Sequence, residues 1–346
     1  MPARLLVVPF VVLAFLAWGV YGPALHLGQG AMPHSSLRPF WCVGVAYFVV
    51  AVVAPLLVLR SRGEQGQWTL AGVLWSVAAG AVGAVGALGI LLAFKFGGRP
   101  MYVMPLVFGG APVVHTVATM ALARSFRGAA ATFYAGVILV ALGVAGVLLF
   151  KPGGAHIRMQ DLSLSVGQFV LEMISIGASA LCWGIYGPLL HKGQARMRGS
   201  GLRPFLCVGL TYFVIAVLLP PLLLTFSAAE GGWTFAGAAW SLAGGAAGAV
   251  GALGIILAFN AGGKPVYVMP LVFGGAPVVN TLLSAAMPST AGQVSPLFYV
   301  SVALVIGGAV TTLVFAPRPG AAAEAEEAPM GQTPAGAQDG GPAGAW

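Results

Sequence analysis

The sequence predicts an all-α integral membrane protein with ten transmembrane helices, arranged as two five-helix repeats of inverted topology. Of its 346 residues, 59% are hydrophobic and only 7% are charged, whereas about a quarter of the residues of a soluble domain are charged. Ten apolar runs are long enough to cross a bilayer, which takes about 20 helical residues. The second half also repeats the first at a constant offset of 165 residues, from Trp18 and Trp183 to Phe150 and Phe315.

Each half contributes five apolar runs. They span residues 5–25, 40–59, 69–94, 101–123 and 129–150 in the first half, and 167–190, 205–226, 234–259, 266–287 and 296–315 in the second. We therefore divide the chain into a first repeat (1–152), a linker (153–166), a second repeat (167–315) and a Pro/Gly/Ala/Glu tail (316–346) that is too poor in apolar residues to fold. The first run resembles a secretion signal, but its counterpart lies deep in the chain, so we expect an uncleaved helix.

The distribution of basic residues predicts the orientation of these helices. Five is an odd number, so the second half must enter the membrane from the opposite side. The loop at 26–39 carries only Arg38, whereas its copy at 191–204 carries four basic residues. With both termini in the cytoplasm, eleven of the sixteen Lys and Arg residues fall on the cytoplasmic side, as the positive-inside rule requires. We expect a bacterial inner (plasma) membrane location.

The most informative stretch is residues 100–116, PMYVMPLVFGGAPVVHT, with its copy at 265–281, PVYVMPLVFGGAPVVNT. Two prolines and a Gly-Gly pair make an uninterrupted helix unfavourable. The predicted helix breaks fall at Pro105, Gly109, Gly110 and Pro112, and at Pro270, Gly274, Gly275 and Pro277. Breaks at corresponding positions of two repeats point to a transporter's binding site.

Three polar residues within the apolar runs are candidates for function. His115 and Asn280 differ within this duplicated stretch. They could bind substrate, with His115 also exchanging a proton, or each could bond a carbonyl that the adjacent proline frees. Glu172 is the only carboxylate inside an apolar run. It could couple transport to protons, or it could be an interfacial residue at a helix start.

Aromatic residues form a second group of candidates. Trp and Tyr lie three residues apart, hence on one helix face, in both WGVYGP and WGIYGP. They could line a substrate cavity together with two further tyrosines, or form the aromatic belt of the membrane interface. These residues are Trp18, Tyr21, Trp183, Tyr186, Tyr102 and Tyr267.

Other features have a plainer alternative. Lys95 and Asn260 end the third and eighth runs; Lys95 could hold an anionic group at the outer cavity mouth or extend to the interface. Arg99 and Lys264 could bind phosphate or anchor the interface. The glycines at 80, 83, 86 and 89, with their copies at 245, 248, 251 and 254, predict close helix packing.

The chain resembles the drug/metabolite transporter superfamily, particularly its EamA-like ten-helix members. The resemblance covers about residues 5–315 and is carried by Trp18-Gly19, Trp183-Gly184 and the junction AFKFGGRPMYVMPLVFGGAPVV. Two features differ: Gly109-Gly110-Ala111 replaces the glutamate that many members carry, and Arg124-Ser125-Phe126-Arg127 replaces a Gly-Glu signature. The resemblance implies alternating access, while leaving the substrate open.

Our leading hypothesis is a secondary transporter for a small organic metabolite, with its site at the midplane between the two repeats. The alternatives are a flippase for a lipid-linked head group and a non-transporting membrane scaffold or accessory subunit. We expect no enzyme activity and no cofactor or metal, because no nucleophile–base pair or metal-ligand spacing is present. The expected partners are the substrate and membrane lipid, with a homodimer left open and no nucleic acid.

Overall fold

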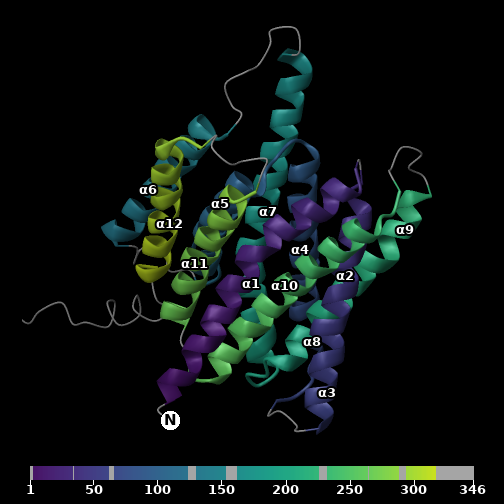
Figure 1. The fold of residues 1–346 in the computed structure, drawn as a ribbon. Coiled ribbons are helices and arrows are strands. Elements are labelled where there is room, and N and C mark those ends of the chain that lie inside the picture. Colours follow the sequence, from purple (N-terminus) through teal and green to yellow (C-terminus); the bar gives the residue numbers. More distant parts are fainter. Residues whose placement is uncertain are drawn as a thin grey trace, which may run out of the picture.

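The structure, a computed structural model, describes residues 3–33, 35–61, 66–123, 130–152, 162–225, 232–263, 265–287 and 294–316. Lys264, most of the expected linker and nearly all of the expected tail lie outside these residues. The described part is helical, and ten of its spans are long and apolar enough to cross a membrane (Figure 1). In chain order the elements are α1 (Ala3–Ala31), α2 (Leu37–Phe48), η1 (Val49–Val53), α3 (Ala54–Ser61), α4 (Leu70–Lys95), α5 (Pro100–Ala123), α6 (Ala131–Phe150), α7 (Leu162–Arg196), α8 (Leu202–Tyr212), η4 (Phe213–Leu218), α9 (Leu219–Leu224), α10 (Phe235–Asn260), α11 (Pro265–Ala285) and α12 (Pro296–Val314).

The second and seventh spans each contain a π-helical segment that the sequence did not predict. These segments, η1 and η4, begin just after Tyr47 and Tyr212 respectively, which lie 165 residues apart. The spans also cross closely: a Cβ on Gly44 would lie 2.7 Å from that of Ala216. Short π segments are frequent at functional sites, so these two point to the neighbourhood of Tyr47 and Tyr212 as a candidate site.

The predicted breaks at the interior prolines do not interrupt either helix. Helix α5 runs through Pro105 and Pro112, and α11 runs through Pro270 and Pro277. The prediction of a break was therefore wrong, because a proline in a membrane-spanning helix removes a single backbone bond that neighbouring groups compensate. Helix α7 also begins at Leu162, five residues inside the expected linker.

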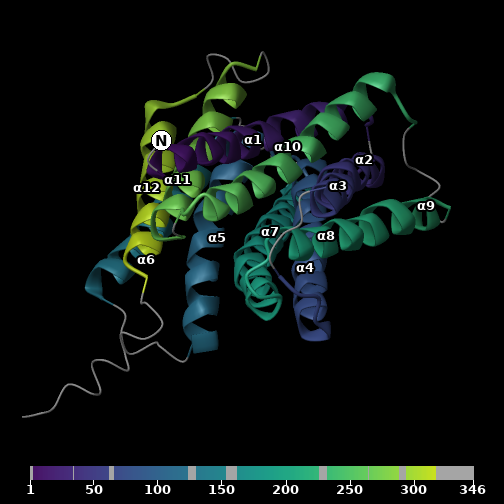
Figure 2. The same cartoon turned by 90° about the horizontal axis from the view of Figure 1, so that it is seen from below.

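The two halves make reciprocal contacts. Helix α1 packs along α10, and α7 packs along α4. The Thr69 hydroxyl, at the start of α4, donates to the Arg196 carbonyl at 3.0 Å. Thr234, 165 residues later, donates to the carbonyl of Ala31 at 2.9 Å. Helices α6 and α12 lie together at one edge of the bundle, away from α2 and α8 (Figures 1 and 2).

The glycine stripes of α4 and α10 are the surfaces on which aromatic rings of the other half pack. A Cβ on Gly86 would lie 2.3 Å from Cδ1 of Trp183, and one on Gly251 would lie within 2.1 Å of the same atom of Trp18. Real Cβ atoms do not approach so closely. The stripes therefore allow close helix packing, as predicted, and they also form the surfaces on which two tryptophans pack in the middle of the bundle.

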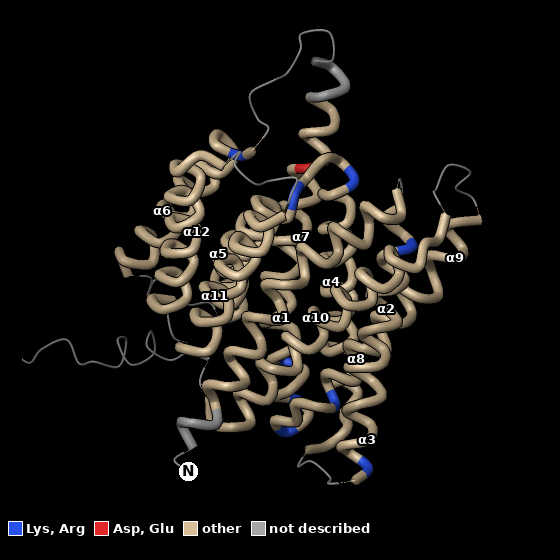
Figure 3. The backbone as a smooth tube through the Cα atoms, viewed as in Figure 1, with Lys and Arg blue, Asp and Glu red and all other residues tan. Residues whose placement is uncertain are grey.

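Charged residues lie mostly towards the two ends of the bundle, as expected for helices that cross a membrane (Figure 3). Among the residues that the structure describes, Glu172 is the only acidic one.

Replacing Gly86 by Ala should destabilise the protein, because the new methyl group overlaps the indole of Trp183. Overpacking of this kind costs about 1–3 kcal/mol, measurable as a lower thermal unfolding midpoint in detergent. The matched control is Gly177→Ala in α7, where nothing lies within 4 Å of the added Cβ. An equal midpoint for the two variants would show that the stripe does not seat the indole.

Candidate functional site

A cavity of about 480 Å³ lies in the middle of the bundle. Part of its wall consists of pairs of residues that lie 165 positions apart, one from each half. These are Trp18 and Trp183, Tyr21 and Tyr186, Tyr47 and Tyr212, Gly83 and Gly248, and Phe108 and Phe273. The cavity is thus built equally by both halves at its inner part.

The indole rings of this wall are fixed in place by hydrogen bonds between the halves. Trp18 Nε1 donates to the carbonyl of Gly248 at 3.1 Å, and Trp183 Nε1 donates to that of Gly83 at 3.3 Å. Phe108 lies with its ring centroid 6.1 Å from each indole. Because both indole N–H groups are occupied, these residues offer ring faces and edges to the cavity.

The cavity extends towards only one end of the bundle, where α5, α7 and α10 end. We call this the open end. The cavity wall at the open end is formed by His115, Thr119, Leu122, Gly187, Pro188, Leu190, His191, Lys192, Gln194, Ala252, Ile255, Ile256, Phe259 and Met269. His191 is exposed and Lys192 half-buried, so this part of the cavity reaches the surface.

At the opposite end of the bundle, where α1 and α4 end, the equivalent residues are packed together. We call this the sealed end. Leu25, Ile90 and Leu91 are fully buried there, although their counterparts 165 residues later line the cavity. The amide of Gln29 donates to the Leu91 carbonyl at 2.9 Å and to the Ser36 hydroxyl at 3.0 Å. Gln194, the counterpart of Gln29, lies on the cavity wall instead.

His115 and Asn280, the two residues that differ within the duplicated stretch, occupy different environments. His115 lines the cavity, with its ring against Gly187 of α7. Asn280 is fully buried at the sealed end, where its Nδ2 donates to the Pro100 carbonyl at 2.8 Å. The Pro100 carbonyl is not one that an adjacent proline frees, so Asn280 connects α11 to the start of α5.

Several other candidates from the sequence lie outside the cavity. Tyr102 and Tyr267 donate their hydroxyls to the carbonyls of Gly97 and Gly262, at 3.2 and 3.3 Å. Lys95 and Asn260 are exposed at the ends of their helices. Of the ten residues expected to contact substrate, the structure thus brings five to the cavity: Trp18, Tyr21, Trp183, Tyr186 and His115.

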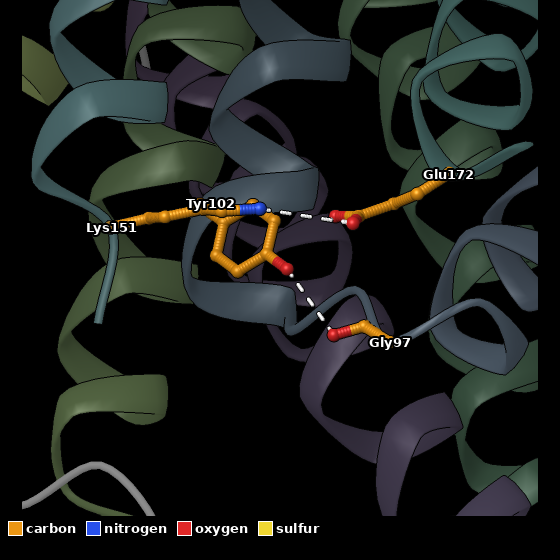
Figure 4. A network of polar contacts seen from close by, with 4 residues as sticks. All are labelled: Gly97, Tyr102, Lys151 and Glu172. Carbon is orange, nitrogen blue, oxygen red and sulfur yellow. Dashed lines mark hydrogen bonds and ion pairs between the residues drawn. The ribbon is translucent and has the colours of Figure 1, made fainter. Parts of the chain in front are cut away.

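Glu172 belongs to a small polar network outside the cavity (Figure 4). Its carboxylate lies 3.8 Å from Nζ of Lys151, and the glutamate is only 4% exposed. The Lys151 ammonium also lies 4.7 Å from the ring centroid of Tyr102 and 5.0 Å from that of Phe169. The network joins the end of α6 to α5 and α7. The counterparts of Lys151 and Glu172 in the other half are Ala316 and Val7, so this ion pair has no equivalent there.

Sequence reasoning missed important wall residues. Tyr47 and Tyr212 stack with centroids 3.9 Å apart and an interplanar angle of 2°, and Phe108 and Phe273 complete the aromatic cluster. Each pair is identical in type and lies within apolar runs 165 positions apart, which is the signal that could have identified them.

Among the described residues, no group of three or more His, Cys, Asp or Glu is placed to hold a metal.

Removing Lys151 should destabilise the protein more than removing both members of the ion pair. In Lys151→Ala the buried Glu172 carboxylate loses its cation, which costs about 1–3 kcal/mol. The double variant Lys151→Ala/Glu172→Gln carries no unpaired charge and should recover part of the loss in the thermal unfolding midpoint. Additive effects in this double-mutant cycle would mean that the two groups do not interact.

Comparison with known proteins identifies the fold alone. No family model matches the chain, and no curated protein matches it. One solved structure, described as "Crystal structure of protein", is similar with a TM-score of 0.53 and 17% sequence identity, over 89% of this chain and 97% of that one.

Proposed function

We propose that the protein is a secondary transporter that moves a small organic metabolite by alternating access. The observation that carries this proposal is a central cavity built by both halves, open at one end of the bundle and sealed at the other by equivalent residues. A binding site at the midplane between two repeats is the arrangement found in many secondary transporters.

The proposal includes an inverted repeat. Three sets of contacts support it: α1 runs antiparallel to α10, α4 runs antiparallel to α7, and α1 and α4 end beside each other at Gln29 and Leu91. Helices α1 and α7, the first helices of the two halves, then run in opposite directions. The resemblance of Trp18-Gly19, Trp183-Gly184 and the α4–α5 junction to EamA-like transporters points the same way.

We place the open end in the cytoplasm, together with both termini. Basic residues favour the cytoplasmic side. Lys192 lies at the open end, and Arg196, Arg198 and Arg203 follow it in the next turns and loop.

The two ends would exchange states during transport. When the sealed end opens, Gln29 would leave Leu91, and Gln194 would form the equivalent contact with Ile256, which is now part of the cavity wall. Residues that lie 165 positions apart would exchange environments between the two states. Each half would then adopt the packing that the other half has in this structure. Packed interfaces of this kind have two discrete arrangements.

Purified protein in liposomes should move at least one solute from a panel of amino acids, amines, sugars, nucleotides and aromatic acids under an ion gradient. Trp18→Leu should reduce this flux, and Trp68→Leu, a change to an exposed tryptophan outside the cavity wall, should not. Flux no faster than in protein-free liposomes, for every solute and gradient, would refute the proposal. Movement of labelled lipid head groups instead would favour a flippase.

Removing the Gln29 side-chain bonds should open the sealed end more often. In a background without the three native cysteines, Leu190→Cys should react rapidly with a water-soluble thiol reagent, and Leu25→Cys slowly, because Leu190 lines the cavity and Leu25 is buried. Adding Gln29→Ala should raise the labelling rate of Leu25→Cys by about fivefold, since a hydrogen bond contributes about 1 kcal/mol. Gln194→Ala is the matched control and should not raise it. Equal effects of the two changes would show that Gln29 does not hold the sealed end.

A further inference from the structure

We propose that the cargo of the central cavity is a planar aromatic solute that is neutral or negatively charged. This inference rests on the proposed transport function and specifies its substrate class. It follows from the ring surfaces of the wall, the charges around the cavity and one hydroxyl without a partner.

The inner wall is made almost entirely of aromatic rings. Trp18, Phe108, Phe273 and Trp183 form a continuous cluster with neighbouring centroids 5.8–6.1 Å apart. Aromatic pairs gain energy beyond the apolar area that they bury. Since the indole N–H groups already bond Gly248 and Gly83, this part of the wall recognises a flat apolar surface through its rings and not through indole hydrogen bonds.

The charges around the cavity disfavour a cation. The wall contains no acidic residue, and Glu172, the sole acidic residue of the described part of the chain, pairs with Lys151 elsewhere. A cation would gain about 0.5–2 kcal/mol from the ring faces but no carboxylate, and burial of an unpaired charge costs more than that. Lys192 at the open end instead carries a positive charge, held 4.6 Å from the ring centroid of Trp75, which attracts anions.

The inner wall carries four phenols, Tyr21, Tyr47, Tyr186 and Tyr212, and the hydroxyl that is buried without a partner is that of Tyr21. Tyr21 lines the cavity and is only 3% exposed, yet its hydroxyl has no hydrogen-bond partner among the described residues. A buried hydroxyl without a partner is costly. The Tyr21 oxygen has almost no accessible surface, so a hydroxyl, carbonyl or carboxylate of the cargo would bond it after a small shift of the phenol towards the cavity that its ring lines. The volume of about 480 Å³ lies within the range of about 300–1,000 Å³ that small-molecule sites have, and suits a cargo of one or two fused rings.

Four two-ring probes test the proposal by equilibrium binding to the full-length protein in lipid nanodiscs, with empty nanodiscs as blanks. They are naphthoate, naphthol, naphthyl-trimethylammonium and the saturated decalin carboxylate. We expect saturable binding of naphthoate and naphthol, and binding at least about tenfold weaker for the other two.

Variants place the bound probe in the cavity. Trp18→Leu should weaken naphthoate binding about tenfold, and Tyr21→Phe, which keeps the ring, should weaken naphthol binding about three- to tenfold. Lys192→Gln should weaken naphthoate binding and spare naphthol. Trp68→Leu is the control and should bind both as the wild type does. The proposal is overturned if the cation or the saturated probe binds as tightly as naphthoate, if no probe binds, or if Trp18→Leu and Tyr21→Phe behave like Trp68→Leu.

Flux of the same solutes separates this inference from the transport function. Binding of naphthoate without flux of any solute would refute transport and leave the aromatic site standing. Flux of an aliphatic or cationic solute, with no naphthoate binding, would leave transport standing and refute the aromatic cargo.

Discussion

The centre of this bundle depends on two indole N–H groups that cannot be left unbonded in an apolar interior. Trp18 and Trp183 each reach across to a glycine carbonyl of the other half, Gly248 and Gly83. Only a helix face without side chains allows an indole to approach the backbone so closely, which explains the glycine stripes of α4 and α10. The two halves are therefore joined by interactions that also form the inner wall of the cavity.

Two halves of closely related sequence nevertheless occupy two different environments. Leu190 and Gln194 are partly exposed on the cavity wall, whereas their counterparts Leu25 and Gln29 are buried. Similar residues can satisfy both arrangements, because each half supplies the same side chains at the same spacing. This is the property that the proposed alternating access needs, since the two states must be close in energy for a cargo to shift the balance between them.

Departures from the repeat distinguish the two ends. Asn280 bonds the Pro100 carbonyl at the sealed end, while His115 lines the cavity at the open end. The Lys151–Glu172 ion pair lies near the starts of α5 and α7, hence at the sealed end, and its counterparts are Ala316 and Val7. Under the proposed alternating access, the Asn280 bond and the Lys151–Glu172 pair at the sealed end would favour the present arrangement over the one with the ends exchanged.

The sequence by itself determined the number and approximate limits of the membrane-spanning helices, because apolar length is a local property of the chain and the 165-residue repeat can be recognised without knowing how the helices pack. It also identified Trp18, Tyr21, Trp183, Tyr186 and His115, since large or polar side chains at repeated positions stand out in an apolar background. Only the tertiary structure decided which of the expected residues share a cavity. It placed Tyr102 on a backbone carbonyl, kept α5 and α11 continuous through their prolines and added Tyr47 and Tyr212 to the wall. The tertiary structure was also needed to distinguish the open end from the sealed end. Two copies of one sequence pattern predict the same environment for both copies, and only their packing shows which copy lies at which end.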